Sequence, residues 1–264
     1  MNILKRELKA NAKSLLIWCL AMASLIYMGM IKYAAFEKTG QAVNQFFEQM
    51  PPAMMQVMGI ESGYDLTSVA VFYSIFFLYF MLLASVHSVM LGTLIIIKEE
   101  RDKTADFLYV KPMKRSAILT YKMLAAFLNI FILNLVTFGV SLMALRPYAE
   151  ASLTKSVWMT MIGLFLIQVL FLGLGLCFGG LFKGSKTGTS IGTTLILGSF
   201  LLKVLIDLNH DLASLEGLTP FRYFQSGDLM FKQYISGEYA LLTLALTSLG
   251  IAGMYYGFIK RDIA

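Results

Sequence analysis

The sequence contains few charged residues. Only 14% of its 264 residues are Asp, Glu, Lys or Arg, whereas 58% are hydrophobic. Soluble domains have roughly 25% charged and ~45 to 50% apolar residues. Cysteine and histidine are also scarce, at two each, and neither His87 nor His210 belongs to an HExxH motif. We therefore expect no disulfide framework, no metal site, no catalytic residues and no cofactor bound by this chain.

Charge is almost absent from six long apolar blocks, and a bilayer helix needs roughly 20 mostly apolar residues. Within the blocks only Lys32, Lys122 and Lys203 are charged. We expect Lys32 and Lys122 to snorkel to the membrane surfaces and Lys203 to pair with Asp207. The sequence predicts one all-α membrane domain over residues 1–264. Its six transmembrane helices are expected at 14–35, 69–97, 118–145, 157–182, 188–206 and 239–259.

The positions of the basic residues predict an orientation. Fifteen of the 22 Lys and Arg residues fall in the segments 1–13, 98–122, 183–187 and 260–264, which share one side of the membrane. That side carries a net +9 and the other a net −3. Cytoplasmic loops are enriched in Lys and Arg, so both termini are expected in the cytoplasm. The overall charge of +6 then reflects topology and contact with the lipid bilayer. It does not indicate nucleic-acid binding.

Residues 1–13 have an apolar and a basic helical face. This pattern predicts an elbow helix lying in the cytoplasmic membrane interface. The alternative is a cytosolic tail that follows the positive-inside rule. The basic residues of this segment are Lys5, Arg6, Lys9 and Lys13.

The inner loop at residues 98–116 has two apolar pairs, Phe107-Leu108 and Tyr109-Val110, among its charges. Pro112 discourages helical geometry at the residue before it. The pattern predicts a short amphipathic helix near residues 104–110. Such a helix either lies on lipid headgroups or inserts its apolar face into a groove of a cytosolic partner.

Two outer segments are too long for tight turns. Residues 36–67 are rich in Met and Phe and predict an apolar surface, which either contacts substrate or fills gaps in the core. Residues 207–238 are interrupted by Gly and Pro and predict a re-entrant or surface-lying hairpin before the sixth span. The candidate substrate contacts are Phe46, Phe47, Met54, Met55, Met58 and His87.

Taken in order, these features resemble the permease subunits of ABC-2-type ATP-binding-cassette exporters. The outer stretches at 50–59 and 218–224 are similar to the family's stretches before its second and sixth spans. One departure is Lys103, which stands where the family has glycine before the threonine of the inner loop. That loop carries the resemblance through Glu99, Glu100, Thr104, Phe107, Leu108, Pro112, Arg115 and Lys122.

The resemblance implies a fold of six spans with an elbow helix, a cytoplasmic coupling helix in the loop 98–116 and re-entrant structure before the sixth span. It also implies that Phe107 and Leu108 fill a groove of a separate cytosolic ATPase. Glu99, Glu100 and Arg115 would pair at the rim of that groove, and Thr104 and Pro112 belong to the same coupling motif.

The resemblance further implies partners and a location. Two permease copies, identical or paralogous, would form the path, and two ATPase copies would bind ATP and Mg²⁺. The complex would reside in a bacterial cytoplasmic membrane. The expected cargo is amphipathic or hydrophobic, foremost peptides, as in toxin export or antimicrobial-peptide immunity.

A self-contained secondary transporter or channel is the alternative. Such proteins place ionisable residues near the membrane midplane and often have repeated halves. Here the remaining intramembrane polar residues are His87, Asn129, Asn134 and Gln168, which we expect to be hydrogen-bonded between helices. The segment 180–187 approaches a phosphate-binding loop, but it has Ser185 in place of a required glycine and follows an apolar span.

Overall fold

The computed structural model describes residues 2–60, 64–102, 114–148, 151–182 and 184–260. Within these ranges every regular element is a helix. Six of the helices are long and apolar enough to cross a membrane, which agrees with the predicted number of spans. They are α1 (Asn2–Thr39), α4 (Val69–Arg101), α6 (Arg115–Leu145), α7 (Ala151–Leu181), α8 (Ser185–Leu208) and α10 (Gly237–Ile259).

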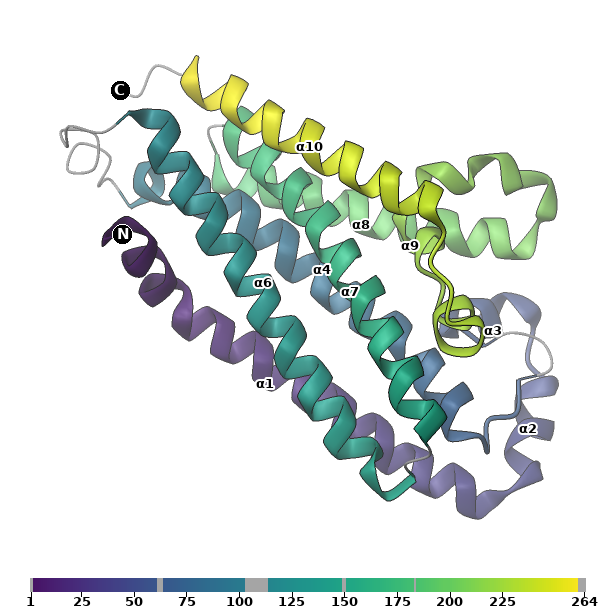
Figure 1. Ribbon diagram of the computed structural model, residues 1–264. Coiled ribbons are helices and arrows are strands. Elements are labelled where there is room, and N and C mark those ends of the chain that lie inside the picture. Colours follow the sequence, from purple (N-terminus) through teal and green to yellow (C-terminus); the bar gives the residue numbers. More distant parts are fainter. Residues whose placement is uncertain (1, 61–63, 103–113, 149–150, 183, 261–264) are drawn as a thin grey trace.

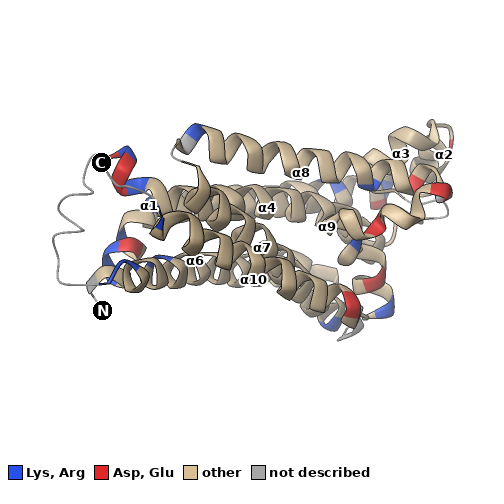
Figure 2. Ribbon diagram, turned by 90° about the horizontal axis from the view of Figure 1, so that it is seen from above, with Lys and Arg blue, Asp and Glu red and all other residues tan. Residues whose placement is uncertain are grey.

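The long helices run roughly along one direction, and both chain termini lie at the same end of the bundle (Figure 1). We call this the terminal end and the opposite one the distal end. Lys, Arg, Asp and Glu gather toward the two ends (Figure 2). This distribution is expected of a helical bundle whose middle lies in hydrocarbon.

Short helices occupy the distal end (Figure 1). Two of them lie between α1 and α4, and three lie between α8 and α10. A further short turn, η1, follows α6. The short elements are α2 (Gln41–Glu48), α3 (Pro52–Met58), η1 (Arg146–Tyr148), η2 (His210–Leu218), α9 (Pro220–Tyr223) and η3 (Asp228–Lys232).

Helix α7 forms the centre of the bundle and packs on α4, α6, α8 and α10. Glycines bring these helices close together: a Cβ on Gly175 would lie 2.4 Å from the carbonyl oxygen of Val89 on α4. A Cβ on Gly250 of α10 would lie equally close, 2.4 Å, to the carbonyl oxygen of Gly173. Membrane helices associate through such small residues because lipid provides no hydrophobic driving force between helices.

The predicted separate elbow helix is not observed, because residues 2–13 continue without a break into the first span as the single 38-residue helix α1. The amphipathic pattern is real, but its apolar face packs on protein. Ile3 is buried against Ile118, and Leu4 and Leu8 pack on the core between α4 and α6. No proline or glycine lies between residue 1 and the apolar block at 14, so nothing in the sequence interrupts the helix.

The segment before the sixth span packs on α7, α8 and α10 rather than extending into solvent. Phe221 is fully buried, with its ring centroid 5.8 Å from that of Phe171 and 6.0 Å from that of Phe200. Arg222 pairs with Asp207 and Glu216, and Lys203 pairs with Asp207 as predicted, at 2.5 Å. The re-entry of this segment into the membrane stays a prediction.

Candidate functional site

The inner loop has its described ends at the terminal end of the bundle, where α4 ends and α6 begins (Figure 1). Glu100 is half-buried and Arg115 is exposed. Four of the predicted coupling residues lie outside the described residues: Thr104, Phe107, Leu108 and Pro112.

Glu99, one of the three residues predicted to pair at the rim of the ATPase groove, is not exposed in this chain. Its side chain is buried, with 3% of the residue exposed, and it accepts a hydrogen bond from Lys122 at 2.5 Å. Lys122 is fully buried and also donates to the carbonyl oxygen of Ile95 at 2.6 Å. The prediction that Lys122 snorkels to the membrane surface is therefore wrong. The Glu99 carboxylate, one turn beyond Ile95 on α4, gives the ammonium a partner inside the protein.

Two residues of α1 complete this arrangement. Arg6 donates to Glu99 at 2.9 Å and to Glu7 at 2.8 Å. The Glu7 carboxylate lies 3.7 Å from the Lys122 Nζ and 3.6 Å from the Lys98 Nζ. We call Arg6, Glu7, Lys98, Glu99 and Lys122 the Glu99–Lys122 cluster. It ties α1, α4 and α6 together at the base of the inner loop.

Sequence reasoning missed the role of Glu7, although a signal was present. Glu7 lies four residues after Ile3 and three after Leu4, so it shares the apolar face of the N-terminal segment while the lysines do not. A carboxylate on a face that packs on protein needs a buried cation. Lys122, four residues into the third apolar block, is the matching signal.

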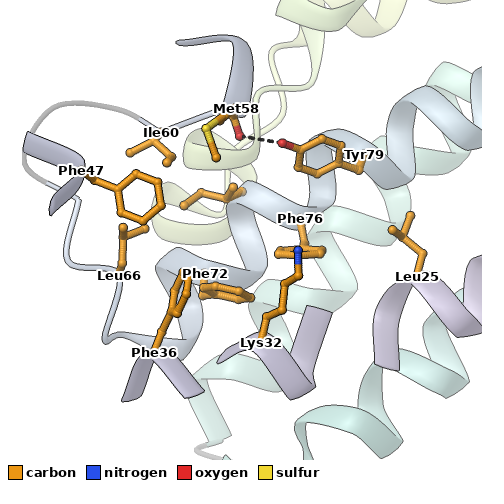
Figure 3. A pocket seen from close by; sticks show the side chains of 11 residues that line it. Leu25, Lys32, Phe36, Phe47, Met58, Ile60, Leu66, Phe72, Phe76 and Tyr79 are labelled. Atoms are coloured by element: carbon orange, nitrogen blue, oxygen red, sulfur yellow. Dashed lines mark hydrogen bonds between the residues drawn. The ribbon is translucent and has the colours of Figure 1, made fainter. Parts of the chain in front are cut away.

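A second feature is a cavity of about 340 Å³ at the distal end, between α1, the short helices and α4 (Figure 3). Phe47 and Met58, two of the predicted substrate contacts, line it. Met55 packs on the hydrophobic cluster beside it. Phe46 and Met54 are exposed, at 59% and 52%.

His87, the sixth predicted contact, lies elsewhere. It is buried on α4 with its ring centroid 5.2 Å from that of Trp18, and it is not among the residues that line the cavity. The predicted hydrogen bond of its ring is not found at Nδ1, which has no partner among the described residues.

The backbone of the loop over the cavity is held by specific contacts. Gly59 ends α3 at a φ of 79°, a left-handed conformation that favours glycine. Asn44 donates to Asp65 at 2.8 Å and accepts from the backbone N–H of Leu66 at 2.9 Å. The hydrogen bonds from Asn44 and Thr67 lower the pKa of the Asp65 carboxyl. The loop and α2 are thereby fixed over the start of α4.

The intramembrane amides serve packing. Asn134 donates to the carbonyl oxygen of Met161 at 3.1 Å and to Gln168 at 3.3 Å, which is the predicted hydrogen bond between helices. Asn129 instead donates to Ala125 on its own helix at 2.8 Å. Both asparagine side chains therefore have hydrogen-bond partners inside the bundle.

Residues 1–263 match the family described as ABC-2 family transporter protein. The chain belongs to this family. A search of curated proteins gives no match. Together with its six apolar helices, membership makes the chain a multi-pass transmembrane permease subunit of an ABC transporter. A permease of this family is a transport subunit in the membrane and is not itself the ATPase.

Proposed function

We propose that this ABC-2 permease forms the translocation path of an exporter and is driven through its inner loop by a separate ATPase. Two permease copies would enclose the path, and two ATPase copies would bind ATP and Mg²⁺. The observation that carries the proposal is the Glu99–Lys122 cluster at the base of the loop. It joins the two helices that flank the loop to each other and to α1.

The cluster gives a physical route for coupling. If the helix ends beside the loop were not linked to each other, each end could shift alone. A force on the loop would then move the loop without moving the spans. Here the carboxylates of Glu7 and Glu99 share the ammonium of Lys122 inside the protein. Separating these buried charges is costly. A force on the loop is therefore expected to move α1, α4 and α6 as one unit.

The charge distribution supports an orientation with the loop and both termini in the cytoplasm. Fifteen of the basic residues belong, by sequence, to the segments 1–13, 98–122, 183–187 and 260–264, which together carry a net +9. The described ends of the inner loop lie at the terminal end. This is the side on which a cytosolic ATPase would bind. The positive-inside rule also makes the distal end, with its Met- and Phe-rich segment, the outer end.

Amphipathic peptides are the proposed cargo. The distal segment presents exposed Phe46 and Met54, and methionine-rich surfaces adapt to varied apolar ligands. The described span residues carry few charges, and Lys122 and Lys203 are neutralised within the chain. Such a path suits an apolar or amphipathic molecule better than a small ion.

The coupling assignment is tested with Phe107→Ala and Leu108→Asp in the inner loop. Both variants are expected to fold and insert, but to lose stimulation of the partner ATPase, because the apolar pair would no longer fill its groove. Lys114→Gln, an exposed position in the same loop, serves as the matched control and should retain stimulation. Unchanged copurification and stimulation in both apolar-pair variants would refute docking through this helix.

A further inference from the structure

The distal cavity has aromatic walls. Five of its lining residues have aromatic rings, and the rings support one another: those of Phe72 and Phe76 stack with centroids 4.9 Å apart. The ring of Phe36 packs edge-on against Phe72 at 5.5 Å. The lining residues are Leu25, Lys32, Phe36, Phe47, Met58, Ile60, Leu66, Phe72, Ile75, Phe76 and Tyr79. Figure 3 shows these side chains converging on one space from α1, α4 and the loop between them.

The volume and chemistry of the cavity suit a small apolar ligand. Ligand sites usually enclose ~300 to 1,000 Å³ and are lined mainly by hydrophobic and aromatic side chains with few polar groups. The distal cavity, at about 340 Å³, falls within that range. Its one hydroxyl group, on Tyr79, already donates to the carbonyl oxygen of Met58 at 3.4 Å. The walls therefore offer little to a ligand with many polar groups.

Lys32 is the one charged residue among the described residues that line the cavity. It is exposed, and its side chain lines the cavity from α1 (Figure 3). The other two lysines of the predicted spans have carboxylate partners, Lys122 with Glu99 and Lys203 with Asp207. No salt bridge to Lys32 is present within the described part of the chain. An ammonium beside an apolar cavity favours a ligand that brings an anion.

We infer that the distal cavity binds a single-chain anionic amphiphile of the fatty-acid type. The alkyl chain lies among the rings of Phe36, Phe47 and Phe72, and the carboxylate lies against the Lys32 ammonium. An extended peptide would bring backbone N–H and C=O groups that the apolar walls leave without partners. An alkyl chain has no such groups. A cationic amphiphile would be repelled by Lys32.

This site goes beyond the proposed function, since binding in the distal cavity requires neither the ATPase nor the proposed peptide cargo. The coupling proposal and the fatty-acid proposal can therefore be refuted independently of each other. Loss of ATPase coupling in the loop variants says nothing about the cavity, and absence of fatty-acid binding leaves the coupling assignment unchanged.

The test uses the purified full-length permease in lipid nanodiscs and a photoactivatable palmitate analogue as probe. After illumination, the labelled peptides are mapped by mass spectrometry at increasing probe concentration. We expect saturable labelling of the segments 25–36 and 72–79, and its removal by excess palmitate. Labelling that does not saturate and is spread over the lipid-facing surfaces would overturn the proposal.

Variants with matched controls test which side chains of the cavity contact the probe. Lys32→Gln is expected to raise the half-saturating concentration by about tenfold, which corresponds to ~1.4 kcal/mol. Lys38→Gln, on the same helix but outside the cavity lining, should leave it unchanged. Phe47→Ala should weaken labelling, whereas Phe46→Ala, at the exposed neighbouring residue, should not. Equal labelling of wild type and Lys32→Gln would refute the role of the ammonium.

Two ligand controls complete the test. The methyl ester of the probe, which has no negative charge, is expected to label wild type and Lys32→Gln equally. An acidic amphipathic peptide should not displace the probe from the cavity. Displacement by the peptide but not by palmitate would assign the cavity to a peptide ligand and overturn the fatty-acid proposal.

Discussion

Replacing Lys122 by methionine tests the buried cluster at the base of the inner loop. The change keeps much of the side-chain volume but removes the charge and both hydrogen bonds of the ammonium, to Glu99 and to the carbonyl oxygen of Ile95. The carboxylates of Glu7 and Glu99 would then have only Arg6 and Lys98 as cationic partners, and the side chains of these two residues are 45% and 25% exposed. Removing one partner of a buried ion pair typically costs ~3 to 5 kcal/mol. We expect a loss of this size in the free energy of unfolding.

The measurement is equilibrium unfolding in mixed micelles, followed by ellipticity, for Lys122→Met, Glu99→Gln and the double variant. Because both single changes break the same interaction, the double variant should be at least ~1 kcal/mol more stable than additivity predicts. Lys9→Met, at an exposed lysine of α1, is the control and should stay within ~0.5 kcal/mol of wild type. Additive effects, or a Lys122→Met variant as stable as the control, would refute the buried pair.

Three further predictions concern packing, the distal segment and orientation. Gly175→Ala places a Cβ 2.4 Å from the Val89 carbonyl oxygen and should cost ~1 to 3 kcal/mol of unfolding free energy by overpacking. Gly139→Ala, with nothing within 4 Å, should not destabilise, and equal losses would contradict the close approach of α4 and α7. Arg222→Gln removes the bridge to Asp207 and Glu216 and should speed amide hydrogen exchange in residues 209–236, whereas Arg146→Gln should not. In a variant without native cysteines, a membrane-impermeant maleimide added to intact cells should label a cysteine at Ala42 but not one at Lys114, and the reverse would invert the topology.

The number and type of the long helices could be predicted from the sequence because composition alone determines them. A run of about 20 apolar residues has few options other than a membrane helix. The surroundings of residues 2–13 could not be predicted in the same way. An amphipathic face is satisfied equally by lipid headgroups or by protein, and only the packed positions of Ile118 and Lys122 show that residues 2–13 lie against protein.

The candidate site was predictable only in part. Glu99 belongs to a conspicuous acidic pair in the sequence, but its partner Lys122 is 23 positions away on another helix, and local sequence does not specify such pairing. The distal cavity shows the same limit. Phe47 and Met58 could be chosen from a local Met- and Phe-rich pattern. Phe72 and Phe76 look like ordinary residues of an apolar span in the sequence, and only the folded structure shows that they line the same cavity.

Reconstitution tests the central claim most directly. The permease and its partner ATPase are placed in proteoliposomes with the ATPase outside, and uptake of a fluorescent amphipathic peptide is measured. The account predicts uptake that requires both ATP and the ATPase and that is lost in Leu108→Asp but kept in Lys114→Gln. Uptake driven by an ion gradient through the permease alone would contradict it and would identify a secondary transporter.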